Sequence, residues 1–231
     1  MKNQTTIIKI LLSAIIIITA LIFMIHANHI IPTGSIPLSK KTVIIDAGHG
    51  SPDSGASTPS GTKEKDINLK IAKKLEKILK KNKANVIMTR TDDNSLSTSK
   101  TNNKREDLRT RKSIRDTSNA DIFISIHMNH FDDPKYYGAQ VFYSESIQQN
   151  KELAECIQDN LIKLADPTNN RQVKSSNEIY ILKNSQTPSV LVECGFLSNP
   201  EEAKKLNDKK YQEKVAWAIY CGITDFLSNK R

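Results

Sequence analysis

Cysteine, glycine, proline and aromatic residues are all scarce in this 231-residue chain. It contains 3 Cys, 8 Gly, 8 Pro and 1 Trp, and aromatic residues make up 6%. So few cysteines exclude a small fold held together by disulfides, and so little Gly and Pro excludes a collagen-like or low-complexity chain. No basic stretch is interleaved with aromatic residues, which argues against a nucleic-acid partner. With 38% hydrophobic and 26% charged residues, the chain is expected to form one ordinary globular domain.

One long hydrophobic run lies at the N-terminus. Residues 10–25 carry no charge, and Lys2 and Lys9 precede them. The run is longer than the ~7–15 apolar residues usual in a signal peptide and shorter than the ~20 residues of a membrane span. We favour a membrane anchor within residues 1–31, with a cleaved signal peptide as the alternative. By the positive-inside rule the two lysines stay in the cytoplasm, so the rest of the chain is exported.

Export determines which partners the positive charge of the chain would meet. Lys and Arg total 34 against 25 Asp and Glu, a formal net charge of +9. An exported basic protein meets anionic wall polymers and lipid headgroups. Residues 32–41 have the composition of a spacer, and residues 42–231 are expected to form the functional domain.

Strands and helices are predicted to alternate after the spacer. Runs of β-branched and apolar residues predict strands at 42–46, 85–89, 121–126, 138–143, 178–182 and 189–193. Apolar residues at helical spacing predict helices at 66–81, 106–117, 147–164 and 211–227. Asn199 followed by Pro200 marks the start of one more helix. This alternation predicts a three-layer α/β/α fold with a central, largely parallel mixed sheet.

Four side chains suited to catalysis lie near the ends of these elements. His49 lies between two glycines after the first strand, and Glu64 lies near the start of the first helix. His127 and Glu193 end two of the most apolar strands. Sites in open α/β sheets gather outside the carboxyl ends of the strands. Two His and one Glu form the ligand set of a catalytic zinc, and a second Glu would serve as its general base or acid.

Other residues are weaker candidates. Arg90 follows a strand and would meet either a peptide carboxylate of the substrate or a surface acid. Asn129 would bind substrate beside the metal or cap its loop. His130 competes with His127 as a ligand, because sequence spacing does not separate them. A basic run is expected to share one solvated or partner-binding helix face; it comprises Arg105, Arg109, Arg111 and Arg115.

Six short motifs follow one another in a characteristic order. They are VIIDAGHG at 43–50, KEKDINL at 63–69, TR at 89–90, ADIFISIHMN at 120–129, GAQVFY at 138–143 and PSVLVECGFLSN at 188–199. Through them the chain resembles the zinc-dependent N-acetylmuramoyl-L-alanine amidase family, over residues 42–227. The resemblance implies that Zn²⁺ is bound by His49, Glu64 and His127, and that Glu193 is catalytic. Ser51 departs from the second glycine that the family usually has after the histidine.

The resemblance also implies an activity and a setting. The expected reaction is hydrolysis of the peptidoglycan amide that joins the lactyl group of muramic acid to L-alanine. A short chain with one apolar N-terminal segment is most similar to the spore-cortex type of the family, which begins muramic-δ-lactam formation. A separate muramic acid deacetylase would then act downstream, and a protein partner would activate or target the enzyme. Two alternatives remain, a zinc peptidase that cuts within the stem peptide and an inactive wall-binding or regulatory module.

Overall fold

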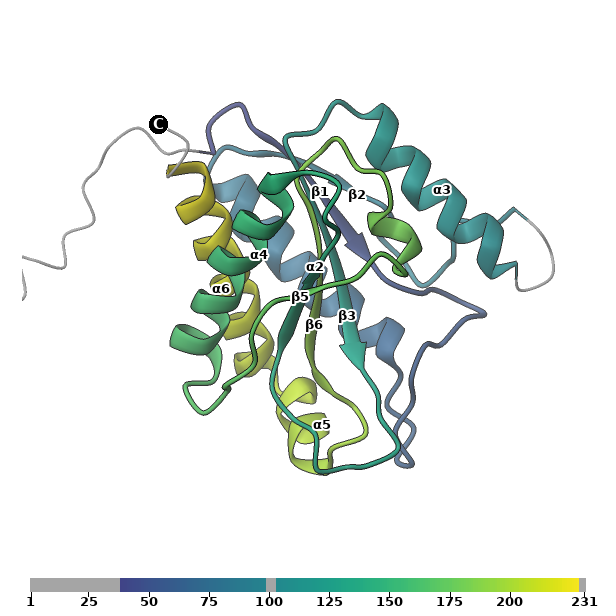
Figure 1. Ribbon diagram of the computed structural model, residues 1–231. Coiled ribbons are helices and arrows are strands. Elements are labelled where there is room, and N and C mark those ends of the chain that lie inside the picture. Colours follow the sequence, from purple (N-terminus) through teal and green to yellow (C-terminus); the bar gives the residue numbers. More distant parts are fainter. Residues whose placement is uncertain (1–37, 99–102, 229–231) are drawn as a thin grey trace, which may run out of the picture. The chain divides into compact units, whose positions relative to one another are not determined.

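Figure 1 shows the computed structural model, which describes residues 38–98 and 103–228. The strands are β1 (Thr42–Ala47), β2 (Asn85–Met88), β3 (Ile122–Asn129), β4 (Gln140–Tyr143), β5 (Lys174–Ser175) and β6 (Ser189–Phe196). They form a six-stranded sheet in the order β2-β1-β3-β6-β4-β5. The neighbours from β2 to β6 pair in parallel, whereas β4 runs antiparallel to β6 and parallel to β5. The predicted largely parallel mixed sheet is therefore confirmed.

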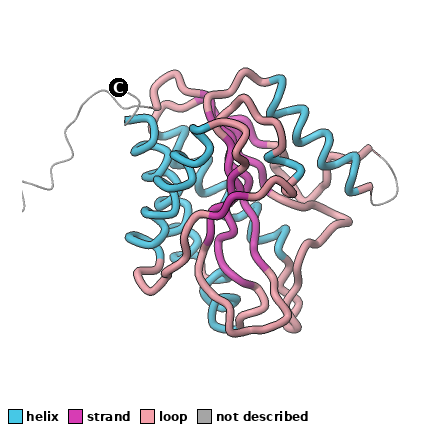
Figure 2. The backbone as a smooth tube through the Cα atoms, viewed as in Figure 1, coloured by secondary structure: helices cyan, strands magenta, loops and turns pink. Residues whose placement is uncertain are grey.

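Helices cover both faces of the sheet. They are α2 (Glu64–Lys81), α3 (Lys104–Thr117), α4 (Gln148–Asn160), α5 (Pro200–Asn207) and α6 (Lys209–Ser228). A π-helical turn, η1 (Leu161–Ala165), continues α4, and a 3-10 turn, η2 (Tyr180–Leu182), precedes β6. Figures 1 and 2 show α2, α4 and α6 on one side of the sheet and α3 on the other. The three-layer architecture is thus confirmed.

The central strands are buried on both faces, which explains why their sequences are continuously apolar. In β1, Val43 and Ile45 belong to the larger core under α2, α4 and α6, whereas Ile44 points into the smaller one. Phe123 and Leu191 join Ile44 in the smaller core, which η2 covers. Because successive side chains of a strand alternate between faces, both layers draw on the same short runs of sequence.

One predicted strand is wrong. Residues 178–182 contain the turn η2, and the strand that pairs with β4 is the earlier, two-residue β5. The backbone around η2 bonds to a side chain instead of a neighbouring strand, because Arg115 donates to the carbonyl oxygens of Ile181 and Lys183. Strands β3 and β6 also extend further than predicted, so that His127 lies inside a strand and Glu193 is followed by three more strand residues.

The predicted membrane segment lies outside the described residues. None of the helices in the described part is both long and apolar enough to cross a bilayer. Leu38 is fully buried in the larger core, and the Nζ atom of Lys41 lies 2.7 Å from Asp121. The folded domain thus includes the last residues of the stretch that composition marked as a spacer.

The contact between α4 and α6 tests the packing of the larger core. A methyl group on Gly222 of α6 would overlap the backbone of Ile157 and Cys156 in α4. We expect Gly222→Ala to lower the free energy of unfolding by about 1–3 kcal/mol, because overpacking costs more than the gain in helix propensity. Urea unfolding of the full chain measures this. The matched variant Lys214→Ala, at an exposed position of α6, is expected to be neutral, and equal stability of the two variants would contradict the close packing.

Candidate active site

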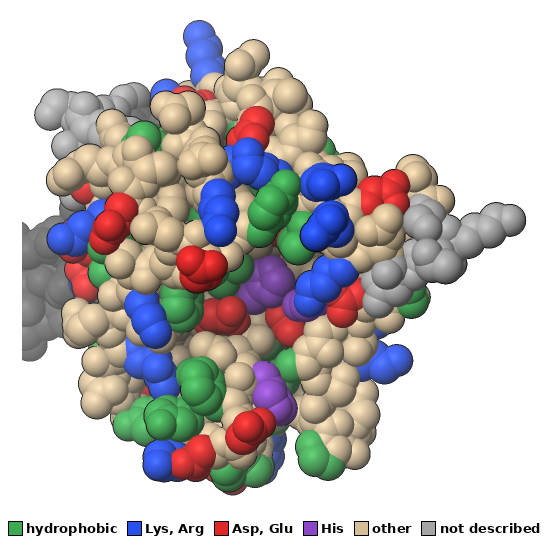
Figure 3. Space-filling model, turned by 45° about the vertical axis from the view of Figure 1, so that its right-hand side comes forward, with side chains coloured by type: hydrophobic (Ala, Val, Ile, Leu, Met, Phe, Trp, Pro, Cys, Tyr) green, Lys and Arg blue, Asp and Glu red, His purple; other side chains and the backbone are tan. Residues whose placement is uncertain are grey.

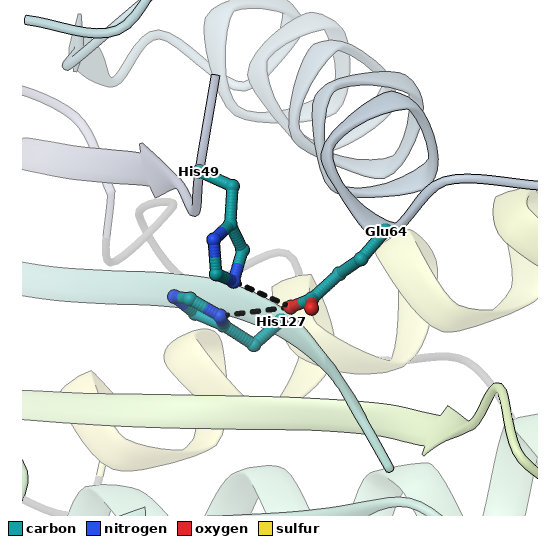
Figure 4. Close-up of side chains that lie close together, drawn as sticks. All are labelled: His49, Glu64 and His127. Carbon is teal, nitrogen blue, oxygen red and sulfur yellow. Dashed lines mark hydrogen bonds and ion pairs between the residues drawn. The ribbon is translucent and has the colours of Figure 1, made fainter. Parts of the chain in front are cut away.

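Three side chains that are distant in sequence converge beside the parallel strands (Figure 4). His49 follows β1 by two residues, Glu64 is the first residue of α2, and His127 lies on β3. β1 and β3 are adjacent and parallel, which brings their carboxyl ends to the same edge of the sheet. The convergence therefore results from the topology, as expected for an open α/β sheet.

The carboxylate of Glu64 is the centre of this cluster. Its Oε1 atom lies 2.9 Å from Nδ1 of His127 and 3.2 Å from Nε2 of His49. One potential ligand atom from each residue lies within 4.8 Å of those of the other two. Two imidazole nitrogens and one carboxylate oxygen fit the donor set of a catalytic zinc, which keeps an open position for water or substrate. These residues could therefore hold a divalent metal ion.

The electrostatics of the cluster favour an ionised Glu64. Burial alone would raise the pKa of Glu64, but hydrogen bonds from His127 and His49 outweigh it and hold the pKa well below its ordinary value. Burial alone would lower the pKa of His49, but hydrogen bonds to Glu64 and Asp53 raise it above the ordinary value. An anionic carboxylate that faces two imidazoles can bind a cation, because a metal ion can take the place of the protons that the imidazole nitrogens share with the carboxylate.

Glycines make room for the cluster. A methyl group on Gly48 would overlap the ring of His127, and one on Gly55 would overlap the Glu64 carboxylate. Between these glycines, His49 has a φ of 61°, a left-handed conformation that non-glycine residues seldom adopt. The turn after β1 is thus shaped to direct the His49 imidazole at Glu64 and His127.

Two buried guanidinium groups hold this turn. Arg111 of α3 donates from Nη1 to the Ala47 carbonyl oxygen at 2.8 Å and from Nη2 to that of His49 at 2.6 Å. Arg90 donates to the carbonyl oxygens of Ala47 and Gly48 at 2.8 and 3.0 Å. Three successive carbonyl groups are therefore bound by side chains, which satisfies backbone atoms that no strand partner reaches and fixes the left-handed residue.

Asp46 neutralises part of this buried positive charge. Its Oδ1 atom lies 2.6 Å from Nη1 of Arg111, and it accepts hydrogen bonds from Thr89 and Ser125 at 2.7 and 2.6 Å. Burial alone would raise the pKa of Asp46, but the Arg111 charge and these hydrogen bonds together lower it. Asp107 pairs with the other edge of Arg111, from Nε to Oδ2 at 2.7 Å.

Asp53 orients His49. Its Oδ2 atom lies 2.8 Å from Nδ1 of His49, and its Oδ1 atom accepts a hydrogen bond from the Gly55 amide at 3.0 Å. With Nδ1 engaged in this way, Nε2 faces Glu64. A carboxylate on the outer nitrogen of a histidine is the usual support for a metal ligand.

Glu193 lies beside the cluster on the neighbouring strand. It is in register with His127 across the β3–β6 pair, so that both side chains project from the same face. Its Oε2 atom is buried and has no hydrogen-bond partner among the described residues. Burial raises the pKa of Glu193 to about 7, with Glu64 adding to the effect and the two histidines opposing it. A buried carboxyl group without a partner is costly unless a reacting group uses it.

The cluster opens onto a hollow of about 200 Å³. It is bounded by His49 and His127, by Leu108 of α3, and by Tyr180 and Leu191. Figure 3 shows histidine side chains in a hollow of the surface, with acidic side chains beside them. The site can therefore be reached from solvent while its carboxylates are largely buried.

The weaker candidates lie in different places. Arg90 is buried, with its nitrogens directed at backbone carbonyl groups, so the expected contact with a peptide carboxylate or surface acid is wrong. Asn129 accepts a hydrogen bond from the His130 amide and so caps its own loop. His130 is exposed and lies outside the three-residue cluster, which contains His127.

The expected basic helix face is also wrong. Arg111 and Arg115 are each only 1% exposed, whereas Arg105 and Arg109 are exposed. Residues four apart share a helix face, but a step of two residues crosses to the opposite face. The run therefore divides into two pairs, of which one builds the interior and the other the surface.

Sequence reasoning missed the residues that support the cluster. Asp46 and Arg111 are a buried ion pair 65 residues apart, which no local pattern reveals. The role of Asp53 could have been inferred from the sequence, because an acid four residues after a loop histidine can reach the outer nitrogen of that histidine. A basic helix containing an acid four residues before Arg111 likewise indicated the Asp107 pair.

Comparisons with known proteins point in one direction. Residues 43–225 match the family described as N-acetylmuramoyl-L-alanine amidase. The germination-specific N-acetylmuramoyl-L-alanine amidase of Bacillus subtilis is 41% identical over 200 residues, which cover 85% of this chain and 84% of that protein. The CwlD amidase of Clostridioides difficile, solved with the GerS lipoprotein, is 51% identical with a TM-score of 0.79 and covers 82% of this chain and 100% of that one. The catalytic domain of CwlV from Bacillus (Paenibacillus) polymyxa is 33% identical with a TM-score of 0.70 and covers 81% and 98%.

The Asp46–Arg111 pair makes a prediction about stability and pH. We expect Asp46→Asn to lower the free energy of unfolding at pH 7 by about 3–5 kcal/mol, because the buried Arg111 guanidinium loses one of its two carboxylate partners and keeps only Asp107. The pKa of Asp46 is lowered on folding. Its contribution is therefore complete above the unfolded pKa of about 3.9 and is lost as pH falls through the folded pKa.

Urea unfolding between pH 7 and pH 3 measures this difference. The gap between wild type and Asp46→Asn is expected to narrow below about pH 4. The exposed carboxylate of Asp132 provides the control, and Asp132→Asn is expected to have little effect at any pH. A gap that stays constant down to pH 3 would contradict a charged, stabilising Asp46.

Proposed function

The chain belongs to the N-acetylmuramoyl-L-alanine amidase family, and from this membership we propose that its amidase site is a zinc centre held by His49, Glu64 and His127. As an amidase of this family it cleaves the bond between the muramic acid lactyl group and L-alanine. The observation that carries the proposal is the convergence of two imidazoles on one buried carboxylate. On the next strand lies Glu193, whose Oε2 atom has no hydrogen-bond partner among the described residues. When bound, zinc supplies polarisation of the amide carbonyl and lowers the pKa of a water molecule.

Glu193 is the proposed general base and acid. Its buried Oε2 atom has no partner among the described residues and so is available to accept a proton. The oxygen of a water molecule attacks the amide carbon while its proton passes to the Glu193 carboxylate. The carbon–nitrogen bond then breaks, and Glu193 returns the proton to the departing L-alanine nitrogen. One carboxyl group thus serves both halves of the reaction.

The residues around the cluster keep it preorganised. Asp53 holds the outer nitrogen of His49, and the Arg111 guanidinium holds the carbonyl group of the same residue. Because the ligands stand on a strand, a helix and a braced turn, little reorganisation is needed when substrate binds.

The proposed setting is the spore cortex, where the enzyme would carry out the first step of muramic-δ-lactam formation. The Bacillus subtilis relative is called germination-specific, which supports this setting. The amidase product has a free lactyl carboxylate, so a separate deacetylase must expose the muramic acid amine before a lactam can close. We further propose that residues 1–31 export the chain, as anchor or cleaved signal, to the cell-wall side of the membrane.

A protein partner is part of the proposal. The Clostridioides difficile CwlD amidase is described in complex with the GerS lipoprotein. A relative of 51% identity that assembles with another protein supports a partner that activates or targets this chain.

Digestion of peptidoglycan tests the reaction and the role of Glu193. The zinc-loaded full chain is expected to release intact stem peptides with a free L-alanine amine, as resolved by mass spectrometry. Glu193→Gln is expected to reduce turnover by about 10²–10⁴-fold while zinc stays bound, because the amide cannot accept the proton. The exposed Glu178 provides the control, and Glu178→Gln is expected to act as wild type. Shortened stems left on the glycan would indicate a peptidase, and full activity of Glu193→Gln would exclude its role.

Zinc content tests the ligands. His49→Ala and His127→Ala are each expected to lose bound zinc and activity together, because two donors rarely hold a catalytic zinc. His130→Ala, at the exposed histidine three residues beyond His127, is the matched control and is expected to retain one zinc per chain. Full zinc occupancy in either of the first two variants, measured by atomic absorption, would refute that ligand.

A further inference from the structure

A second hollow adjoins the site on the side of α3. It has a volume of about 650 Å³ and is lined by Lys104, Arg105, Leu108, Arg109 and Tyr180. Three of these residues, Lys104, Leu108 and Tyr180, also line the hollow that contains His49 and His127. The two hollows are therefore adjacent, and a substrate that extends from the site in this direction passes over α3. We call the second hollow the α3 groove.

The α3 groove is positively charged. Lys104, Arg105 and Arg109 are exposed, and none of them forms an ion pair with a described residue. Figure 3 shows Lys and Arg side chains gathered on one side of the hollow that contains histidines, with hydrophobic side chains between. The charge extends to the site itself, because Lys104 also lines the hollow that contains His49 and Asp53.

In the described part of the chain, none of the three acids of α3 forms an ion pair with Lys104, Arg105 or Arg109. Glu106 accepts hydrogen bonds from Ser97 and Thr98. Asp107 pairs with Arg111, and Asp116 pairs with Lys112 and Arg115 further along the helix. The groove is thus an electropositive surface next to a reactive centre, a placement that attracts and orients anions.

Apolar residues separate the site from the α3 groove. They indicate which part of a substrate would lie between the bond that is cleaved and an anionic group bound in the groove. Leu108 and Tyr180 border both hollows, and Ile179 and Leu191 add to the apolar wall on the site side. This wall suits a small apolar side chain such as the methyl group of L-alanine. Two extended residues span about 7 Å, so a carboxylate one residue beyond L-alanine comes within reach of the long basic side chains.

We propose that the α3 groove binds the free α-carboxylate of the glutamyl residue that follows L-alanine in the stem peptide, and selects peptides with this acid over their amidated forms. The proposal rests on the amidase function of the neighbouring site. It also sets the direction of the substrate, with the peptide over α3 and the glycan leaving the site on another side. Tyr180, which lines the groove together with the cations, provides a planar apolar surface for the peptide.

Two matched substrates test the proposal. One is N-acetylmuramoyl-L-alanyl-γ-D-glutamyl-L-lysine with a free glutamyl α-carboxylate, and the other has an α-carboxamide at that position. The double variant Arg105→Ala/Arg109→Ala is measured in the zinc-loaded full chain purified in mild detergent. We expect its KM for the acid to rise about tenfold with kcat unchanged, and its KM for the amide to stay the same, since each exposed ion pair contributes a few-fold. Arg105→Lys/Arg109→Lys is expected to restore most of the loss.

A matched double variant controls for general charge. Lys210→Ala/Lys214→Ala removes two exposed charges from α6, on the opposite side of the sheet, and is expected to leave both KM values unchanged. Equal loss on acid and amide, or no change in KM for the acid, would overturn the role of the groove while the amidase reaction stands.

A binding measurement separates this proposal from the reaction itself. Calorimetric titration with the tripeptide L-alanyl-γ-D-glutamyl-L-lysine requires no turnover. Wild type is expected to bind it about tenfold more tightly than the double arginine variant does, and the difference is expected to shrink at high salt. Equal affinities of wild type and variant for the tripeptide would overturn the role of the groove, whether or not the wild-type chain cleaves the two substrates. Failure of the wild-type chain to cleave either substrate would instead refute the proposed amidase site.

Discussion

The Arg111 guanidinium is the interaction on which the site depends. It is buried among two carboxylates, Asp46 and Asp107, and two carbonyl groups of the turn that carries His49. The same group therefore attaches α3 to the end of β1 and fixes the backbone of a proposed ligand. Its planar fork of donors suits this task, because a lysine supplies only a point charge. A buried ion pair is seldom retained for stability alone, and here it has a geometric purpose.

The geometry of the site depends on the carbonyl groups that the buried arginines Arg90 and Arg111 bind around His49. A left-handed histidine is strained unless the surrounding structure determines its conformation, and the bound carbonyl groups on either side of it do so. The neighbouring glycines then become necessary, because the His127 ring occupies the space of a side chain at Gly48. The glycines, arginines and aspartates around His49 thus act together to hold its backbone and its imidazole in place.

The sequence predicted what depends on local pattern and missed what depends on contacts across the fold. Apolar runs predicted the strands of the sheet core, and Asn199 predicted the start of α5, where it accepts hydrogen bonds from two backbone amides. Residues 178–182 also look like a strand, yet they form a turn because Arg115 binds the backbone there. The convergence of His49, Glu64 and His127 came from the family resemblance, since parallel strand order cannot be read from spacing. The roles of Arg111 and Asp46 needed the structure.

The arginines of helix α3 have two different roles, although in the sequence they form one basic run. Arg111 and Arg115 point inward, where they hold the His49 turn and the η2 backbone. Arg105 and Arg109 stand on the other face and line the groove beside the site. Because η2 carries Tyr180, Arg115 also positions a wall of that groove. The helix thus couples the arrangement of the proposed metal ligands to that of the proposed peptide-binding surface, so that a shift of α3 would disturb both together.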